Sequence, residues 1–182
     1  MDILHKSAFT RNQPPAIKMD RLCRKLHFTC FCATITATKG RVFPMIKILF
    51  VCHGNICRSP MAEFVMKDMV EKAGLSHRFE IASAAASREE LGNPVYPPAR
   101  RELARHGIAC DGHRARQITA ADLQSYDRIY YMDRNNRQRL ARMFPDFDGF
   151  LPFLDRDVAD PWYTGDFEAT YRDVLEGCSN LL

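Results

Sequence analysis

Hydrophobic positions change their spacing several times along the chain from residue 45 onward. Short, largely apolar runs predict buried β-strands at residues 46–51, 79–83, 128–132 and 150–154. Apolar residues at helical spacing predict helices from Pro60 to a stop at Gly74, and at residues 98–106, 134–143 and 166–182. Strands that alternate with helices are typical of a parallel sheet with helical crossovers. The pattern therefore predicts an α/β fold.

The first 44 residues show no clear period, and Pro14, Pro15 and Gly40 interrupt them. A chain of 182 residues can bury one sizeable core, so we expect one domain and an appendage. Residues 1–44 carry eight Lys/Arg and two Asp, whereas residues 45–182 carry 18 Lys/Arg and 20 Asp/Glu. We interpret residues 1–44 as a basic leader, either disordered or an upstream start-site extension. Targeting to an organelle and nucleic-acid binding stay open as its alternatives.

The seven cysteines of the chain are irregularly spaced, and no convincing secretory signal precedes them. This usage favours reduced thiols over a disulfide framework, and we therefore expect a cytoplasmic protein. No apolar run approaches the roughly 20 residues that a membrane-spanning helix needs.

Residues 51–60, VCHGNICRSP, lie where the first predicted strand turns into the first predicted helix. Helix N-termini present unpaired N–H groups and a positive dipole end, which bind phosphate-like anions. Gly54 and Asn55 suit the positive φ angles that turn successive amides inward. Arg58 adds a two-pronged donor for phosphate oxygens, and Ser59 is a natural N-cap. We expect Cys52 to be a thiolate in this field, so the segment combines an anion-binding loop with a nucleophile.

The spacing Cys-x5-Arg alone is a weak signal, because Cys110 and Arg116 share it in the segment CDGHRAR. That segment follows a helix stop rather than an apolar strand, and Asp111 would repel an anion. We therefore interpret Cys110 as a structural or surface cysteine.

The chain from Met45 to its end resembles the low-molecular-weight protein tyrosine phosphatases. The resemblance rests on VCHGNICRSPMAE, on MDRNN at 132–136 and on DPWYTGDFEATYRDV at 160–174. It implies a phosphatase domain at residues 45–182, with a doubly wound, four-stranded parallel sheet, flanking helices and an active site at the carboxyl ends of the strands. It also implies a phosphoric monoester hydrolase without metal or other cofactor. The expected substrates are phosphotyrosine proteins or small aryl phosphates; neither nucleic acid nor membrane is expected as a partner, and the oligomeric state stays open.

Position by position, the resemblance assigns a role to each central residue. Cys52 matches the nucleophile that forms a phosphocysteine, Arg58 the phosphate-clamping arginine, and Asp160 the general acid and base. Asn55 matches the residue that holds the shape of the loop, and Ser59 the hydroxyl that supports the thiolate. The phosphate-binding loop also contains His53, Gly54, Ile56 and Cys57, and the pocket wall contains Trp162 and Tyr163. We expect His53 to be exposed rather than a base, and Asp133 to cap the following helix. A catalytic part for Asp133 and Asn136 stays open as the alternative.

Cys57 has two compatible interpretations. A neighbouring thiol can trap an oxidised nucleophile as a reversible disulfide, and the resemblance implies such protection of Cys52. Alternatively, Cys57 is a small buried side chain that packs the loop.

The chain departs from the family pattern in SAAASREELGNP at residues 83–94, where many members carry Gly-Thr and then Trp-His. Glu89 and Glu90 make the rim of the pocket more acidic, which leaves the substrate preference open. Ile56 favours the tyrosine-directed branch, whereas phosphoarginine phosphatases tend to carry Thr there.

Four alternative functions remain at this stage. A phosphoarginine phosphatase would share the fold. A thiol-dependent arsenate reductase of the same fold needs a close downstream cysteine pair, whereas Cys110 and Cys178 stand alone. A zinc or redox binding module built on Cys52 and Cys57 would place Arg58 beside a cation. A nucleic-acid-binding protein would depend on the basic leader.

Overall fold

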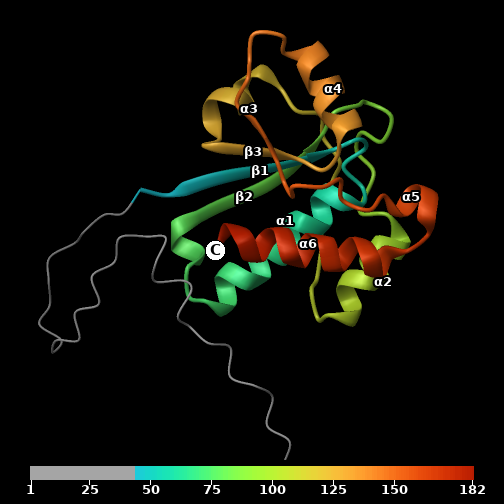
Figure 1. Ribbon diagram of the computed structural model, residues 1–182. Helices are drawn as coiled ribbons and strands as arrows, with labels where there is room; N and C mark the ends of the chain where they lie inside the picture. The colour runs from blue at the N-terminus through green and yellow to red at the C-terminus, as the bar shows by residue number, and fades with distance from the viewer. Residues whose placement is uncertain (1–43) are drawn as a thin grey trace, which may run out of the picture. The chain divides into compact units, whose positions relative to one another are not determined.

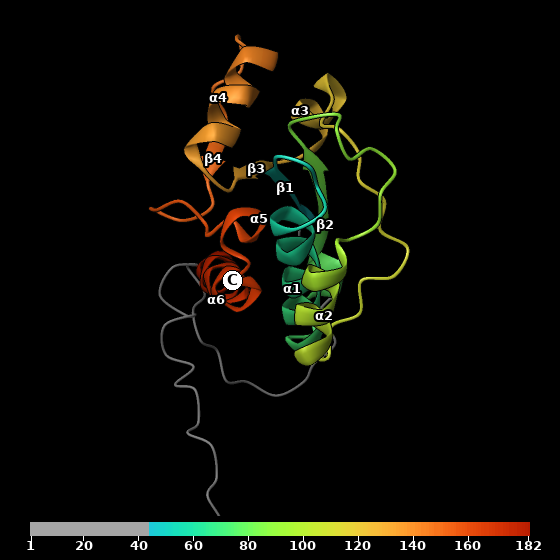
Figure 2. The same ribbon diagram turned by 90° about the vertical axis from the view of Figure 1, so that its right-hand side faces the viewer.

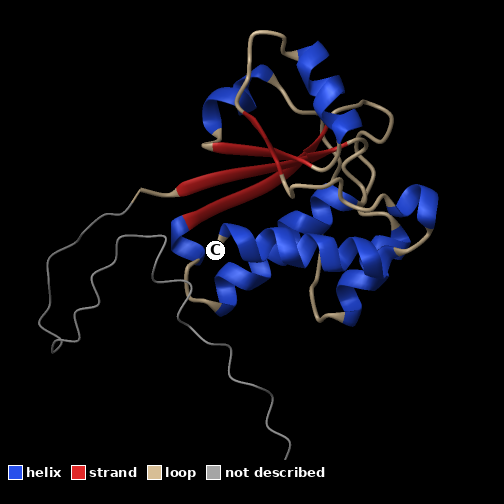
Figure 3. Cartoon of the chain, viewed as in Figure 1, coloured by secondary structure: helices blue, strands red, loops and turns tan. Residues whose placement is uncertain are grey.

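The strands form one parallel sheet in the computed structural model, which describes residues 44–182. The four strands of this part are β1 (Ile46–Cys52), β2 (Phe79–Ala85), β3 (Arg128–Tyr131) and β4 (Phe150–Pro152). Their order is β2-β1-β3-β4. Figure 3 shows the strands in red. The chain therefore winds in one direction from β1 to β2 and in the other from β3 to β4. The carboxyl ends of strands at such a reversal are where α/β proteins bind ligands.

Helices cover both faces of the sheet (Figures 1 and 2). One face carries α1 (Arg58–Lys72), α2 (Pro97–Arg105) and α6 (Phe167–Leu181). The other carries α3 (Ala120–Ser125) and α4 (Arg134–Met143). The short α5 (Pro161–Thr164) precedes α6, and the 3-10 helix η1 (Ser76–Arg78) leads into β2.

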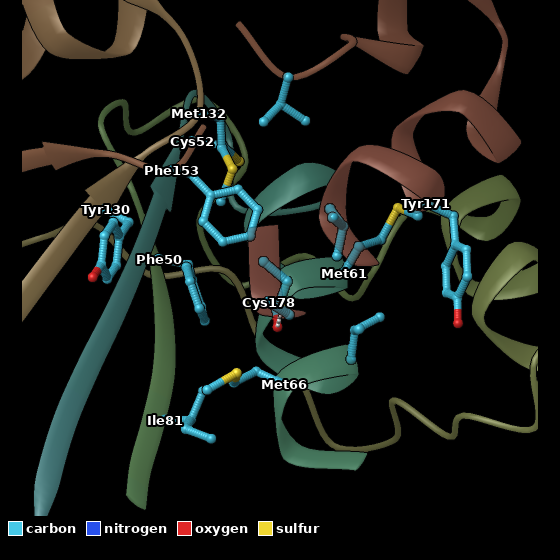
Figure 4. Close-up of a cluster of buried hydrophobic side chains, with 14 of the residues drawn as sticks. Phe50, Cys52, Met61, Met66, Ile81, Tyr130, Met132, Phe153, Tyr171 and Cys178 are labelled. Atoms are coloured by element: carbon cyan, nitrogen blue, oxygen red, sulfur yellow. Dashed lines mark hydrogen bonds between the residues drawn. The ribbon is translucent and has the colours of Figure 1, made fainter. Parts of the chain in front are cut away.

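The side chains of β1 supply both layers of the core, because successive residues of a strand point to opposite faces. Ile48, Phe50 and Cys52 belong to the cluster under α1, α2 and α6, which is drawn in Figure 4. Leu49 and Val51 belong to the cluster on the opposite face, under α3 and α4. Cys52 therefore rests on the packed core at the carboxyl end of the strand.

The predicted fold class is confirmed, and each predicted strand and helix is present, α4 with the predicted bounds and the others with shifted ends. β2 runs two residues further than predicted, and β4 ends two residues earlier. The hydrophobic pattern does not predict α3, α5 or η1, because six, four and three residues are too few to show a helical period.

The prediction that Ser59 caps α1 is wrong. Helix α1 begins at Arg58 with Cys57 in the N-cap position, and Ser59 lies inside the first turn.

Residues 1–43 lie outside the described part of the chain, and the predictions for the basic leader fall there. Within residues 44–182, no helix has the length and apolar character needed to span a membrane.

Candidate active site

Cys52 ends β1, and the five residues of the β1–α1 loop, residues 53–57, join it to α1. Two backbone hydrogen bonds hold this loop against the segment that follows β2. The carbonyl of Cys52 accepts from the amide of Ala86 at 2.8 Å, and that of His53 from the amide of Ser87 at 3.0 Å. The sulfur thus lies at the carboxyl edge of the sheet, where β1 and β3 part.

The N-terminus of α1 has no side-chain cap. Cys57 makes no side-chain hydrogen bond to the helix amides, and the first turn contains no acidic residue. A helix start without such partners leaves N–H groups and a partial positive charge for an anion. The Cys52 sulfur lies 3.0 Å from the Ser59 hydroxyl and 3.3 Å from the Asn55 amide, two groups that stabilise a negative sulfur.

Asn55 holds the shape of the β1–α1 loop. Its φ angle of 59° lies in the left-handed region, which asparagine tolerates better than most residues. Its buried side-chain amide donates to Ser59 Oγ at 2.9 Å and to Ser83 Oγ at 2.8 Å. Its side-chain oxygen accepts from the backbone amide of Arg116 at 3.1 Å. One side chain therefore ties the loop to α1, to β2 and to the segment before α3.

Two further contacts support the loop and, like that of Arg116, are not apparent from the sequence. His113 Nε2 lies 2.8 Å from the Asn55 carbonyl, and Ser83 donates to the buried Glu63 at 2.5 Å. His113 and Arg116 belong to CDGHRAR, whose cysteine spacing imitates the motif. This segment therefore supports the β1–α1 loop through hydrogen bonds to Asn55, and we do not interpret it as a second anion site. Single polar residues in distant segments carry no periodic signal that could have identified them.

Replacing Asn55 should separate backbone strain from hydrogen bonding. Asn55→Gly removes the buried side-chain hydrogen bonds, but glycine adopts a positive φ without strain. Asn55→Ala removes the same hydrogen bonds and also forces alanine into the left-handed region. We expect Asn55→Gly to lower the free energy of unfolding by about 2–4 kcal/mol. Asn55→Ala should lower it by roughly 1 kcal/mol more. Urea unfolding of the two variants measures the difference; equal stabilities would show that the conformation of residue 55 is unstrained.

Arg58 reaches back from the first turn of α1 and is 3% exposed. One arm of its guanidinium forms an ion pair with Asp133, and the other lies 2.6 Å from an oxygen of Asp160. Burial lowers the pKa of Arg58, but the charges of Cys52, Asp160 and Asp133 raise it by more. The guanidinium is therefore a permanent cation whose two arms are directed at oxyanions.

Asp133 is the N-cap of α4, as predicted, since its side chain accepts from the amide of Asn136 at 2.6 Å. The same carboxylate orients Arg58, a second role that the sequence does not show. Asn136 is buried and lines the pocket.

Asp160 is the N-cap of α5, with its side chain 3.1 Å from the amide of Trp162. This short helix presents two aromatic rings to solvent: Trp162 is 59% exposed and Tyr163 is 86% exposed. Both line a cavity of about 450 Å³, together with Cys52 and Arg58. The fold thus brings the predicted nucleophile, arginine, carboxylate and aromatic wall into one pocket.

Gly54 differs from its prediction, because its φ angle lies outside the left-handed region. Its hydrogen atom serves close packing instead. A Cβ at this position would lie 2.9 Å from Glu90 Cγ, so the loop after β2 rests directly on the β1–α1 loop. His53 is half-buried, with its Nε2 atom 2.8 Å from a carboxylate oxygen of Glu89, where the sequence predicts an exposed side chain. Ile56 is buried and lines the pocket.

The other described cysteines differ from Cys52 in their surroundings. Burial, followed by the charges of Cys52 and Asp160, raises the pKa of the Cys57 thiol against the opposing effect of Arg58. Burial also raises the pKa of Cys110 and of Cys178, and neither of these lines the pocket. Cys57 packs the loop, and a disulfide between Cys57 and Cys52 stays a prediction. Within residues 44–182, no group of three or more His, Cys, Asp or Glu side chains is arranged to hold a metal ion.

The chain is similar to proteins of known family and structure. Residues 47–182 match the model of the low molecular weight phosphotyrosine protein phosphatases. The low molecular weight protein-tyrosine-phosphatase YfkJ of Bacillus subtilis is 40% identical over 147 residues, covering 76% of this chain and 94% of YfkJ. The crystal structure of YfkJ matches with a TM-score of 0.73 over 78% of this chain and 94% of that one. SP-PTP, the low molecular weight protein tyrosine phosphatase of Streptococcus pyogenes, is 42% identical with a TM-score of 0.71, covering 76% and 91% of the two chains.

These similarities confirm the resemblance that the motifs indicate and the fold that it implies. Both the match to the family model and the identity to YfkJ extend over about three quarters of the chain. The chain belongs to the low molecular weight protein-tyrosine-phosphatases, a family of phosphoric monoester hydrolases.

Proposed function

We propose that the chain hydrolyses phosphotyrosine and small aryl phosphates through a phosphocysteine formed on Cys52. The observation that carries the proposal is the convergence of a nucleophilic sulfur, an uncapped helix N-terminus, a two-armed guanidinium and a carboxylate in one pocket. The guanidinium and the helix N–H groups suit phosphoryl transfer, because its transition state spreads negative charge over three equatorial oxygens, while the sulfur supplies a nucleophile and the carboxylate an acid.

Binding of the phosphoryl group reorganises the ion pairs of Arg58. Both arms of the guanidinium face carboxylates, and a phosphate dianion competes for at least the arm that pairs with Asp160. Asp133 keeps the other side of the guanidinium oriented while it caps α4. The displaced carboxyl of Asp160 then lies beside the bound ester, where it can reach the leaving oxygen. Binding of the substrate therefore prepares the general acid.

In the first chemical step the Cys52 thiolate attacks phosphorus. The bond from phosphorus to the phenolic oxygen breaks, and Asp160 transfers its proton to the departing oxygen. The amides of the β1–α1 loop and Arg58 stabilise the equatorial oxygens.

In the second step water attacks the phosphorus of phosphocysteine. Asp160, now a carboxylate, accepts the proton of the water, and the sulfur departs as the thiolate that the Ser59 hydroxyl and the Asn55 amide stabilise. Inorganic phosphate leaves, and the starting protonation state is restored. No further reactant is needed.

The shape of the pocket favours an aromatic phosphate ester. The sulfur lies at the inner end, since Cys52 is 3% exposed, whereas the rings of Trp162 and Tyr163 stand at the mouth. A long, flat side chain can pack against these rings and still reach the sulfur, and a short phosphoserine cannot do both. Ile56 adds apolar surface to the loop itself.

A panel of phosphorylated peptides tests the proposal on the full chain. One sequence is prepared with phosphotyrosine, phosphoserine, phosphothreonine or phosphoarginine, and phosphate release is followed with and without a chelator. We expect kcat/KM for phosphotyrosine to exceed the others by at least about 10²-fold, with no effect of the chelator. Preference for phosphoarginine would assign the alternative substrate, and loss of activity with the chelator would favour a metal-dependent reaction. Thiol-dependent reduction of arsenate without phosphatase activity would assign the reductase.

A further inference from the structure

The mouth of the pocket has walls of opposite charge. Glu89 and Glu90, from the loop after β2, line one wall. Arg139 and Arg142, from α4, line another. Arg88 precedes the glutamates in the chain but does not line the pocket. The site therefore presents a negative and a positive surface to whatever surrounds the phosphorylated side chain.

The positive wall is one face of α4. Pocket-lining residues at positions 135, 138, 139 and 142 follow the spacing i, i+3, i+4 and i+7, which places side chains on one side of a helix. Such a stripe extends about 10 Å along the helix axis. An extended peptide rises about 3.3 Å per residue, so the stripe can reach roughly three residues beyond a bound phosphotyrosine.

The arginines of this wall are not engaged within the described part of the chain. Arg139 and Arg142 are exposed and form no ion pair with a described carboxylate, whereas Arg156, on the surface elsewhere, pairs with Asp173 and Glu176. By contrast, both glutamates of the acidic wall have partners within the protein. Glu89 lies 2.8 Å from His53 Nε2, and Glu90 accepts a hydrogen bond from the side chain of Asn93 at 2.7 Å.

The two walls are close enough to interact electrostatically. Hydrogen bonding with His53 is the main cause of the lowered pKa of Glu89, and the charge of Arg139 contributes to it. A ligand between the walls therefore experiences a field directed from α4 toward the glutamates.

We propose that α4 is a specificity surface for acidic residues flanking phosphotyrosine. Arg139 and Arg142 bind carboxylates within about three residues on one side of the phosphotyrosine, and the glutamate wall excludes them from the other side. The inference rests on the proposed function and names the substrate class more narrowly: acidic phosphotyrosine peptides. It depends on two arginines, without a carboxylate partner among residues 44–182, on the face of α4 that borders the pocket.

Three phosphotyrosine peptides test the inference. The first has alanines around the phosphotyrosine, the second three glutamates before it and the third three glutamates after it. With the wild-type chain at low salt, we expect one acidic peptide to have a kcat/KM about tenfold above that of the alanine peptide, and the other to have none of this gain. The gain should decline as salt is added.

Charge variants of α4 show whether the preference for an acidic peptide depends on Arg139 and Arg142. Arg139→Gln with Arg142→Gln should remove the preference, and Arg139→Glu with Arg142→Glu should invert it. The readout is the ratio of kcat/KM between acidic and alanine peptides, so a general loss of activity does not imitate the result. Arg137→Glu, on the same helix and also exposed but outside the pocket, is the matched control and should keep the wild-type ratio.

The possible failures are distinct. If the wild-type chain hydrolyses none of the three peptides, the proposed function is wrong. If it hydrolyses all three peptides equally, or if Arg137→Glu changes the ratio as much as the pocket variants do, the inference about α4 is overturned while the phosphatase activity stands.

Discussion

Cys52→Ser should lower kcat/KM for phosphotyrosine by at least about 10⁴-fold while the protein stays folded. Serine is nearly isosteric with cysteine, and its hydroxyl can keep the contact to Ser59, which lies 3.0 Å from the sulfur. A hydroxyl is not ionised at neutral pH, however, so the loop amides and Arg58 would surround a phosphate that nothing attacks. The variant should therefore bind a phosphotyrosine peptide and fail to release phosphate from it, as measured by calorimetry and by a phosphate assay.

The chain provides its own control for this experiment. Cys110 has the same Cys-x5-Arg spacing, is also buried and does not line the pocket. Cys110→Ser should keep the activity of the wild-type enzyme. Full activity in Cys52→Ser would refute the phosphocysteine mechanism, and loss of activity in Cys110→Ser alone would move the nucleophile to the second segment.

Asp160→Asn should lower kcat/KM for phenyl phosphate and phosphotyrosine by about 10²–10³-fold. Asparagine can still cap α5 through the contact that Asp160 makes with the amide of Trp162, but it has no proton to give to the leaving phenolate. For p-nitrophenyl phosphate the loss should be at least tenfold smaller, because nitrophenolate leaves without full protonation. Since kcat/KM includes only the steps through formation of phosphocysteine, the comparison isolates the role as acid.

Asp166 is the matched residue for this test. It caps α6 by accepting from the amide of Ala169 at 2.8 Å, just as Asp160 caps the preceding helix, and it does not line the pocket. Asp166→Asn should leave the kinetics unchanged for both leaving groups. An equal loss for the two leaving groups in Asp160→Asn would show that Asp160 acts through its charge on Arg58 and not as an acid.

Local pattern accounts for the elements that the sequence predicts well. β1 and α4 are long enough to show their periods, and the bounds predicted for α4 agree with the structure. The strand–loop–helix arrangement around Cys52 was also predictable, because the strand end, the loop and the helix start are contiguous in VCHGNICRSP. The hydrophobic pattern does not predict helix α5, because four residues are too few to show a helical period. Only the Asp-Pro pair marks its start.

Ser59 and Gly54 show why a correct motif can carry incorrect details. Each residue has an ordinary local use, as an N-cap and as a residue with positive φ. In the fold, the Ser59 hydroxyl contacts the Cys52 sulfur, and Gly54 leaves room for Glu90. The local preferences of Ser59 and Gly54 therefore indicate conformations that they can adopt, whereas contacts with distant residues determine their roles in the fold.

The sequence alone determined the alternation of strands and helices, the place of VCHGNICRSP between the first strand and the first helix, and the family to which the chain belongs. These depend on residues that are neighbours in the chain. Tertiary structure alone decided how Arg58 is shared between Asp133 and Asp160, how Asn55 is held by β2 and by Arg116, and that a basic face of α4 meets an acidic loop across the pocket. The physical reason is the parallel sheet: it brings the carboxyl ends of distant strands to one edge, and no spacing along the chain records which side chains meet there.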